Sequence, residues 1–261
     1  MRALWTGTIT FGLVTIPIKL YSGSESHHLD LDLLRKGDLC PIKYSRVCRV
    51  DGKEVPWEEI TKGYAYQDGD YILLAKEDFA KASPQNSHTI EINHFVKESE
   101  IDPVFYSTPY FMEPKKEGQK AYALLLKALA ETKLVGVGEF VMRNHENLAV
   151  IKPYGDVLLL HKLRYNDEIR ATDTLKLPTA DLIKPNELKM ATQLVNQLTE
   201  AFVPDDYKDT YFDELKKIIA AKATGKKLKK PKKITETGNV TDIMDLLKKS
   251  LVKTTKRKKI K

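Results

Sequence analysis

Residues that favour β-strands dominate the chain from residue 2 to residue 165. The first such stretch, residues 2–21, is rich in Thr, Ile, Val and aromatic side chains, which suit a pleated, half-buried surface. Gly7 and Gly12 interrupt it, and we expect a bulge or a close backbone approach there. Pro17 lacks an amide donor, which favours an edge or a bend. The stretch therefore predicts the opening strands of a β-rich core.

Two Asp-Gly pairs, at residues 51–52 and 68–69, lie between strand-like runs. Asp-Gly supplies the positive φ angles of a tight turn, so we expect β-hairpins over residues 44–57 and 63–74. Polar and apolar residues alternate in part over residues 88–96, which predicts a strand, and several later runs are strand-like. The further elements expected are a helical turn at 56–60, a helix at 77–82 and strands at 88–96, 110–113, 135–143, 148–152 and 157–165.

Helical periodicity marks three segments. Residues 118–133 place Ala121, Leu124, Leu125, Ala128 and Leu129 on one face. Strands on both sides of this helix predict an α+β fold with a closed or nearly closed antiparallel β-barrel and helices outside it. Two amphipathic helices follow, and Gly225 is expected as a C-cap. These helices are predicted over residues 186–202 and 208–223.

The net charge of +7 is distributed unevenly. From Lys222 onward there are 15 Lys and Arg against three acidic residues, a net charge of +12. The preceding residues carry 28 basic and 33 acidic side chains, a net of −5. If that part binds DNA, its positive charge must gather on one surface. Residues 226–239 are predicted to be a self-repelling lysine-rich linker, and residues 253–261 a basic tail able to neutralise phosphates.

A short amphipathic helix is predicted over residues 240–252, between the linker and the tail. Thr241 can cap it. A helix of this length is not stable alone in water, so its apolar stripe has to dock. Either its own core or the groove of a partner protein could receive it. The stripe consists of Ile243, Leu246, Leu247 and Leu251.

Motifs of enzyme chemistry are missing from the sequence. It contains no phosphate-binding glycine loop, no GxSxG elbow, no HExxH and no paired-cysteine metal site. We therefore expect no catalytic activity and no cofactor, with a nuclease built from scattered carboxylates as an alternative. Cys40 and Cys48 are expected to be reduced thiols, and the His27-His28 pair a solvated turn. No apolar run is long enough to span a membrane, and no secretory signal is recognisable.

Ordered short motifs covering residues 2–220 resemble the bacterial Ku proteins of non-homologous end joining. The opening reads Trp-Thr-Gly at 5–7, Phe-Gly-Leu-Val at 11–14 and Ile-Pro-Ile-Lys-Leu-Tyr at 16–21. Tyr-Ser-Arg-Val-Cys at 44–48 follows, and Leu-His-Lys-Leu-Arg at 160–164 comes last. Between these two lie matching motifs at residues 51–57, 63–66, 71–79, 101–103, 109–110 and 120–125.

The resemblance implies a ring-shaped homodimer that threads onto a broken duplex end and grips its backbone without reading sequence. It implies a core over residues 1–185 with a DNA-bridging arm at about 35–85, and a helical dimer arm over 186–225. The helix at 240–252 is similar to the segment through which bacterial Ku recruits DNA ligase D. Such a protein is expected in the cytoplasm, associated with the nucleoid.

The resemblance also suggests which cations face DNA. The arm candidates are Lys43, Arg46, Arg49 and Lys76. The barrel candidates are Lys133, Arg143 and Lys152, with Lys19 from the opening stretch. The alternative is an architectural protein that binds DNA through its basic tail and has no preference for ends.

Overall fold

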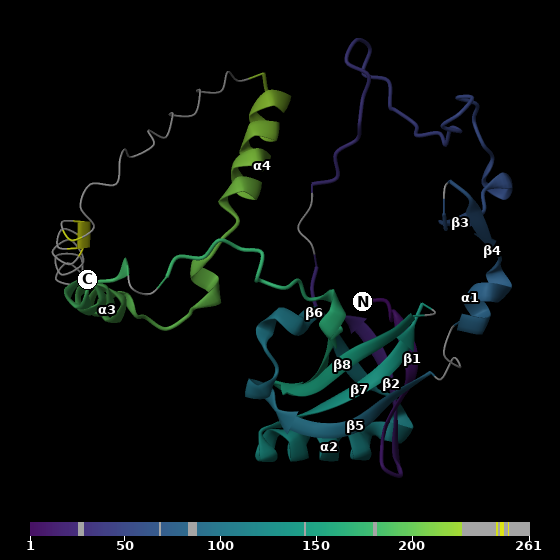
Figure 1. The fold of residues 1–261 in the computed structure, drawn as a ribbon. Helices are drawn as coiled ribbons and strands as arrows, with labels where there is room; N and C mark the ends of the chain where they lie inside the picture. The colour runs from purple at the N-terminus through teal and green to yellow at the C-terminus, as the bar shows by residue number, and fades with distance from the viewer. Residues whose placement is uncertain are drawn as a thin grey trace. The chain divides into compact units, whose positions relative to one another are not determined.

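The computed structural model describes residues 1–25, 29–67, 69–82, 88–143, 145–179 and 182–225, with positions 244, 246, 247 and 250. The chain divides into two compact units, Met1–Ala171 and Thr172–Lys261. Figure 1 shows the elements of both. Each unit is described by itself.

The first unit is built on a closed seven-stranded barrel with the strand order β1-β2-β6-β9-β8-β7-β5. The neighbours around the barrel pair antiparallel except β1 and β5, which pair parallel. The predicted closed barrel is thus confirmed, with one parallel pair that the sequence did not indicate. The strands are β1 (Trp5–Phe11), β2 (Val14–Ser22), β5 (Thr89–Lys97), β6 (Tyr106–Pro114), β7 (Leu134–Met142), β8 (His145–Tyr154) and β9 (Val157–Leu163).

The opening stretch forms the β1–β2 hairpin, in register from Trp5 opposite Leu20 to Phe11 opposite Val14. Gly7 is required because the backbone of the neighbouring strand approaches closely. A Cβ on Gly7 would lie 2.1 Å from the carbonyl O of His88. Pro17 differs from expectation, because β2 is an interior strand; its pairing with β6 begins only at the next residue, Ile18.

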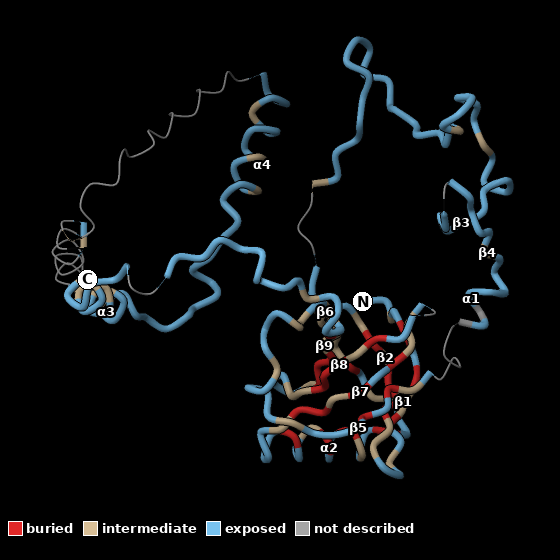
Figure 2. The backbone as a smooth tube through the Cα atoms, in the orientation of Figure 1, coloured by how far each residue is buried: buried red, intermediate tan, exposed pale blue. Residues whose placement is uncertain are grey.

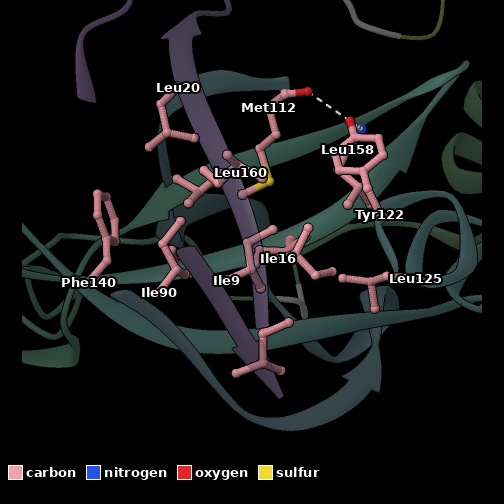
Figure 3. Packing of buried hydrophobic residues seen from close by; sticks show 14 of the residues in the cluster. Ile9, Ile16, Leu20, Ile90, Met112, Tyr122, Leu125, Phe140, Leu158 and Leu160 are labelled. Atoms are coloured by element: carbon pink, nitrogen blue, oxygen red, sulfur yellow. Dashed lines mark hydrogen bonds between the residues drawn. The ribbon is translucent and has the colours of Figure 1, made fainter. Parts of the chain in front are cut away.

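Inward-facing residues of the strands fill the barrel (Figure 3). Helix α2 (Gln119–Thr132) covers the end of the barrel where β7 begins and packs on the same cluster (Figure 1). The hydroxyl of Tyr122 donates to the Met112 carbonyl O (2.7 Å) and accepts the Leu158 N–H (2.7 Å). It therefore joins α2 to β6 and β9.

The buried face of α2 is rotated from the predicted one. Tyr122, Leu125 and Leu129 are buried, whereas Leu124 is 65% exposed. The Tyr122 side chain, whose hydroxyl makes the two hydrogen bonds, is buried where the aliphatic periodicity predicted Leu124 to be buried.

Smaller differences concern strand ends. The turn expected at residues 144–147 is shorter, because β8 begins at His145. The strand expected near residues 110–113 is longer and begins at Tyr106. Alternation along the strand at 88–96 predicts that His94 shares the buried face of Ile90 and Ile92. A register shift between Ile92 and His94 breaks this alternation, and His94 is exposed.

The segment between β2 and β5 has its own local structure, and we call its described residues, 29–67 and 69–82, the arm. Where the structure describes burial in the arm, which it does for all of these residues except 80 and 82, none is buried (Figure 2). Strands β3 (Lys62–Ala65) and β4 (Tyr71–Leu74) form the predicted second hairpin. A 3-10 turn η1 (Trp57–Glu59) and helix α1 (Lys76–Ala82) are also confirmed. The first predicted hairpin is reduced to a single bridge between Val47 and Glu54.

The second unit contains helices α3 (Pro185–Leu198) and α4 (Thr210–Ala223). Both were predicted, although α3 ends before Phe202, because the chain is extended at Thr199. Gly225 follows α4 with a φ of +69°, as expected for a C-cap. None of the described helices is long and apolar enough to cross a membrane.

Candidate nucleic-acid interface

Three cations of the arm lie close together in the sequence without an acidic neighbour. Residues 39–50 contain Lys43, Arg46 and Arg49 and no Asp or Glu. All three side chains are exposed. Among the described carboxylates, none lies within 4.0 Å of their charged nitrogens. We call Lys43, Arg46 and Arg49 the cationic segment.

A tight turn holds the end of this segment. The N–H of Cys48 donates to the Lys53 carbonyl O (2.8 Å), and Gly52 has a φ of +71°. The Asp51 carboxylate accepts the Lys53 N–H (3.1 Å), and this hydrogen bond is the main cause that lowers the pKa of Asp51. The Asp-Gly signal in the sequence therefore marked the turn correctly, although it joins no regular strands.

Trp57 orients one member of the cationic segment. The guanidinium carbon of Arg46 lies 4.5 Å from the centre of the Trp57 ring. Such a cation–π contact holds one face of the guanidinium and leaves its edge donors available. Trp57 is 66% exposed, so the contact forms on the surface. Sequence reasoning missed this pairing, although an aromatic residue near a basic run was visible.

Arg35, Lys53 and Lys62 of the arm have partners. Arg35 forms an ion pair with Asp38, and the resulting hydrogen bonds raise the pKa of Arg35 and lower that of Asp38. Lys53 lies 3.7 Å from Asp51, and the Lys62 ammonium lies 4.9 Å from the Phe79 ring centre. Lys76, one of the predicted contacts, is exposed at the first position of α1.

Lys19 lies on the outer face of the barrel, because its neighbours Ile18 and Leu20 are fully buried inside. It is directly opposite Glu113 of β6. The Glu113 carboxylate accepts a hydrogen bond from the Tyr21 hydroxyl, and this bond is the main cause that raises the pKa of Tyr21. The surroundings of Lys19 are therefore of mixed charge.

Lys133 and Arg143 do not form one cluster. Both are exposed and both have a positive φ, of +56° and +54°. They flank the two ends of β7, which separates them by roughly 30 Å at about 3.3 Å per residue. The sequence placed both on the barrel, and the structure shows that they belong to opposite ends of it.

Lys152 is the predicted contact whose charge is already compensated. Its ammonium forms an ion pair with Glu98, and its side chain is only 22% exposed. The same ammonium lies 5.8 Å from the Tyr106 ring centre. Lys152 therefore has a structural role on the outer face of the barrel, and its contact with DNA stays a prediction.

Tyr106 also packs against His161, with ring centres 5.1 Å apart in an edge-to-face arrangement. Burial is the main cause that lowers the pKa of His161, and the charge of Lys152 adds to it. Burial likewise raises the pKa of Tyr106. This neighbourhood favours the neutral form of both rings.

Sequence reasoning missed Lys162 of β9. It lies opposite Ala149, which is fully buried, and it alternates with Leu158 and Leu160 on the inner side of the barrel. The alternation in Leu-Leu-Leu-His-Lys-Leu was visible in the sequence and could have placed this lysine inside.

The structure describes only part of the apolar stripe of the C-terminal segment. Leu246 and Leu247 are helical, the first exposed and the second half-buried. Ile243 and Leu251 lie outside the described residues, as do the linker at 226–239, the tail at 253–261 and the His27-His28 pair. The docking prediction stays a prediction.

A sequence model of the family described as "Ku: Ku70/Ku80 beta-barrel domain" matches residues 10–196. The chain belongs to the Ku family. Proteins named "Non-homologous end joining protein Ku" are similar to it over nearly its whole length. The protein from Coxiella burnetii is 38% identical, with 99% of this chain and 97% of the relative covered. Those from Opitutus terrae and Pseudomonas aeruginosa are 39% and 37% identical, with 97% and 96% of this chain and 92% and 88% of the relatives covered.

Membership of the Ku family confirms the resemblance drawn from the ordered motifs. The matched range begins near the end of β1, contains the other barrel strands and the arm, and ends within α3. Within the described ranges, no group of three or more His, Cys, Asp or Glu side chains could hold a metal ion. Cys40 and Cys48 are both free thiols, the first exposed and the second half-buried.

Proposed function

We propose that this chain binds the ends of double-stranded DNA without reading base sequence, as a ring-shaped homodimer in non-homologous end joining. One observation carries the proposal: Ku proteins of that name match it at 35–39% identity over nearly the whole chain, including the arm. The exposed cationic segment supports it. A closed ring can load only where a duplex ends, so selectivity for breaks requires no contact with bases.

Contacts with the phosphate backbone supply such binding. Arg46, held by Trp57 with its edge donors outward, can contact a phosphate through paired N–H groups. Lys43 and Arg49 add charge on the same segment. The body of the chain is acidic overall, so a local cationic surface would draw DNA to the arm and away from other faces.

The dimer would form through the second unit. Helices α3 and α4 have no buried residue, and Leu188, Val195 and Leu198 of α3 are each more than half exposed. A second copy of the chain could cover these faces. We further propose that the helix at 240–252 recruits DNA ligase D and that the chain itself catalyses no reaction.

Competition between linear and circular DNA tests the ring. A labelled linear duplex of arbitrary sequence should bind, and unlabelled linear duplex should compete. The same sequence as a closed circle should fail to compete. Equal competition by the circle would contradict the ring and favour an architectural protein driven by its tail.

The cationic segment is tested by the triple variant Lys43→Gln, Arg46→Gln and Arg49→Gln. If all three contact phosphates, the slope of log K against log salt should become shallower by roughly 2.7, at about 0.9 per contact. The matched control neutralises Lys97, Lys116 and Lys120, which are exposed on the barrel unit. An equal change in the control would assign the loss to overall charge.

Recruitment of the ligase is tested by Leu247→Asp, which places a charge in the apolar stripe. End binding should persist while stimulation of DNA ligase D is lost. Asn239→Asp adds the same charge just before the helix and should retain stimulation. Stimulation by the Leu247 variant at the control level would rule out the docking role.

A nuclease activity is tested by incubating the protein with linear and circular DNA and Mg²⁺ or Mn²⁺. Both substrates should stay intact on a denaturing gel. Metal-dependent cleavage that copurifies with the protein would overturn the non-enzymatic assignment.

A further inference from the structure

The end of the barrel away from α2 contains a pocket of about 220 Å³. Helix α2 leads into the start of β7, whereas this pocket lies where β7 ends and β8 begins. We call it the basic pocket, because three of its lining residues have basic side chains. Its polar and aromatic lining consists of Tyr110, Arg143, His145, Asn147, Lys162 and Phe140.

Strand alternation separates the charges at this end of the barrel. Lys162 lies on the side of buried Leu158 and Leu160. His145 lies opposite Met142, and both line the pocket, whereas the next residue, Glu146, does not line it. Lys162 is half-buried, and Arg143 and His145 are exposed at the rim. None of the described residues that line the pocket is an Asp or a Glu. Three basic residues therefore line one space that no described acidic residue lines.

Such a space favours an anion. Positive groups that face one another repel, and a bound anion replaces this repulsion by attraction. The arginine offers a planar fork, the lysine a compact charge and the histidine a ring N–H. That set suits an anion with several oxygens and two charges better than a single carboxylate.

The size of the pocket limits the ligand. Its volume lies below the roughly 300–1,000 Å³ of pockets that enclose drug-sized molecules. A phosphate group fits this space, whereas the remainder of a nucleotide would extend outside. The backbone of the pocket is also held in place at His145. Asn147 is only 5% exposed, and its side-chain N–H donates to the His145 carbonyl O (2.7 Å).

We propose that the basic pocket binds the phosphate group of a phosphomonoester. The group could belong to the terminus of a DNA strand or to a free nucleotide, since both present the same dianion. This inference goes beyond the proposed function, because gripping a duplex by its backbone requires no site for a terminal phosphate.

Binding is measured on the full chain without DNA. Isothermal titration with inorganic phosphate and with adenosine 5′-monophosphate should give saturable binding, and acetate at matched ionic strength should give none. Lys162→Met should raise the Kd for phosphate about 10- to 100-fold, as expected for the loss of one charge-assisted hydrogen bond. Lys162→Arg should retain binding, and Lys120→Met, an exposed lysine of α2, should equal the wild type.

Three results would overturn the proposal: no saturable binding of phosphate, equal binding of acetate, or unchanged affinity in the Lys162→Met variant. Trp5 fluorescence in a Trp57→Phe background reports whether that variant folds. If it does not, His145→Leu provides the same comparison from another strand, and unchanged affinity there would equally contradict the pocket.

Duplexes that differ only in a 5′-phosphate or a 5′-hydroxyl then identify the source. Tighter binding of the phosphorylated end, lost in Lys162→Met, would assign the pocket to DNA termini. Phosphate binding without such a preference would assign it to free phosphomonoesters. The titration contains no DNA, so a negative result would contradict the pocket proposal and not the proposed end binding. Competition by circular DNA would contradict the ring and not the pocket proposal.

Discussion

The barrel and the arm contain the same kinds of apolar side chain and bury them very differently. Ile16, Leu20 and Ile90 of the barrel are fully buried, whereas Tyr71 and Leu73 of the arm are 68% and 66% exposed. Both regions contain antiparallel strand pairs, of 7 to 10 residues a strand in the barrel and of four in the arm. A two-stranded hairpin has no second layer to cover either face, while a closed barrel covers its inner face with itself. Closure, and not hydrophobic content, decides where this chain has a core.

The largest expected effect is on the inner face of the barrel. Leu160→Ala should lower the free energy of unfolding by about 2 to 5 kcal/mol, because it leaves a cavity in a packed core. Leu73→Ala in the arm should change it by less than about 0.5 kcal/mol. Trp5 fluorescence in a Trp57→Phe background reports the barrel alone, since these are the only two tryptophans. Equal losses would show that the arm contributes to the same cooperative unit.

A smaller loss is expected where α2 joins the strands. Tyr122→Phe removes the hydroxyl that pairs the Met112 carbonyl and the Leu158 N–H and leaves both buried groups without it. The expected cost is about 1 to 3 kcal/mol. Tyr64→Phe, a change of the same chemistry on an exposed ring of the arm, is the control in denaturant titrations. A neutral Tyr122 variant would mean that water replaces the hydroxyl.

The second unit extends the comparison to helices. Leu188→Asp with Leu198→Asp should leave the unfolding midpoint of the barrel unchanged within about 0.5 kcal/mol. If the α3 face receives a second copy, sedimentation should show that this variant is a monomer. Gln193→Glu with Asn196→Asp adds two charges at exposed polar positions of α3 and should not alter the association. A dimeric leucine variant would exclude this face from the interface.

The smallest effect concerns His161. Its pKa in the folded protein lies below the ordinary value of 6.5, so on acidification the unfolded chain takes up this proton first. The contribution to stability is complete above about pH 7 and is lost as the pH falls through 6.5 toward the lowered pKa. His161→Gln should therefore flatten the fall of the melting temperature between pH 7.5 and 5.5. His94→Gln, at an exposed ring, should not.

Element types could be predicted from the sequence wherever a local signal decides them. The opening strands, the hairpin closed by Gly69 and the helix at 119–132 follow from strand formers, turn residues and periodicity. Gly12, expected at a bulge or a close backbone approach, instead forms the turn between β1 and β2 with a φ of +56°, and a Cβ there would meet no described atom within 4 Å. The parallel contact of β1 with β5 could not be predicted, because it depends on how a closed sheet meets itself. The rotated face of α2 depends on the hydrogen bonds of Tyr122 with residues far along the chain.

The candidate site likewise has features that could be predicted from the sequence and features that could not. An absence of acidic residues around Lys43, Arg46 and Arg49 is visible in the sequence, and the structure shows all three exposed. That Lys152 has a carboxylate partner in Glu98 depends on the path of the chain before β6. Strand alternation alone could have predicted the inward position of Lys162, although a lysine is not expected inside a barrel.

The parallel seam between β1 and β5 has a consequence for the integrity of the chain. Strands β1 and β2 precede the arm and β5 to β9 follow it, so the barrel is assembled from two portions of sequence joined through the arm, in which no residue of described burial is buried. Ile9, Ile16, Ile18 and Leu20 of the first portion lie inside the second. A protease that cuts the arm would therefore yield two fragments that stay together under native conditions and separate only when denatured. The covalent continuity of the arm and the persistence of the barrel are independent properties of this molecule.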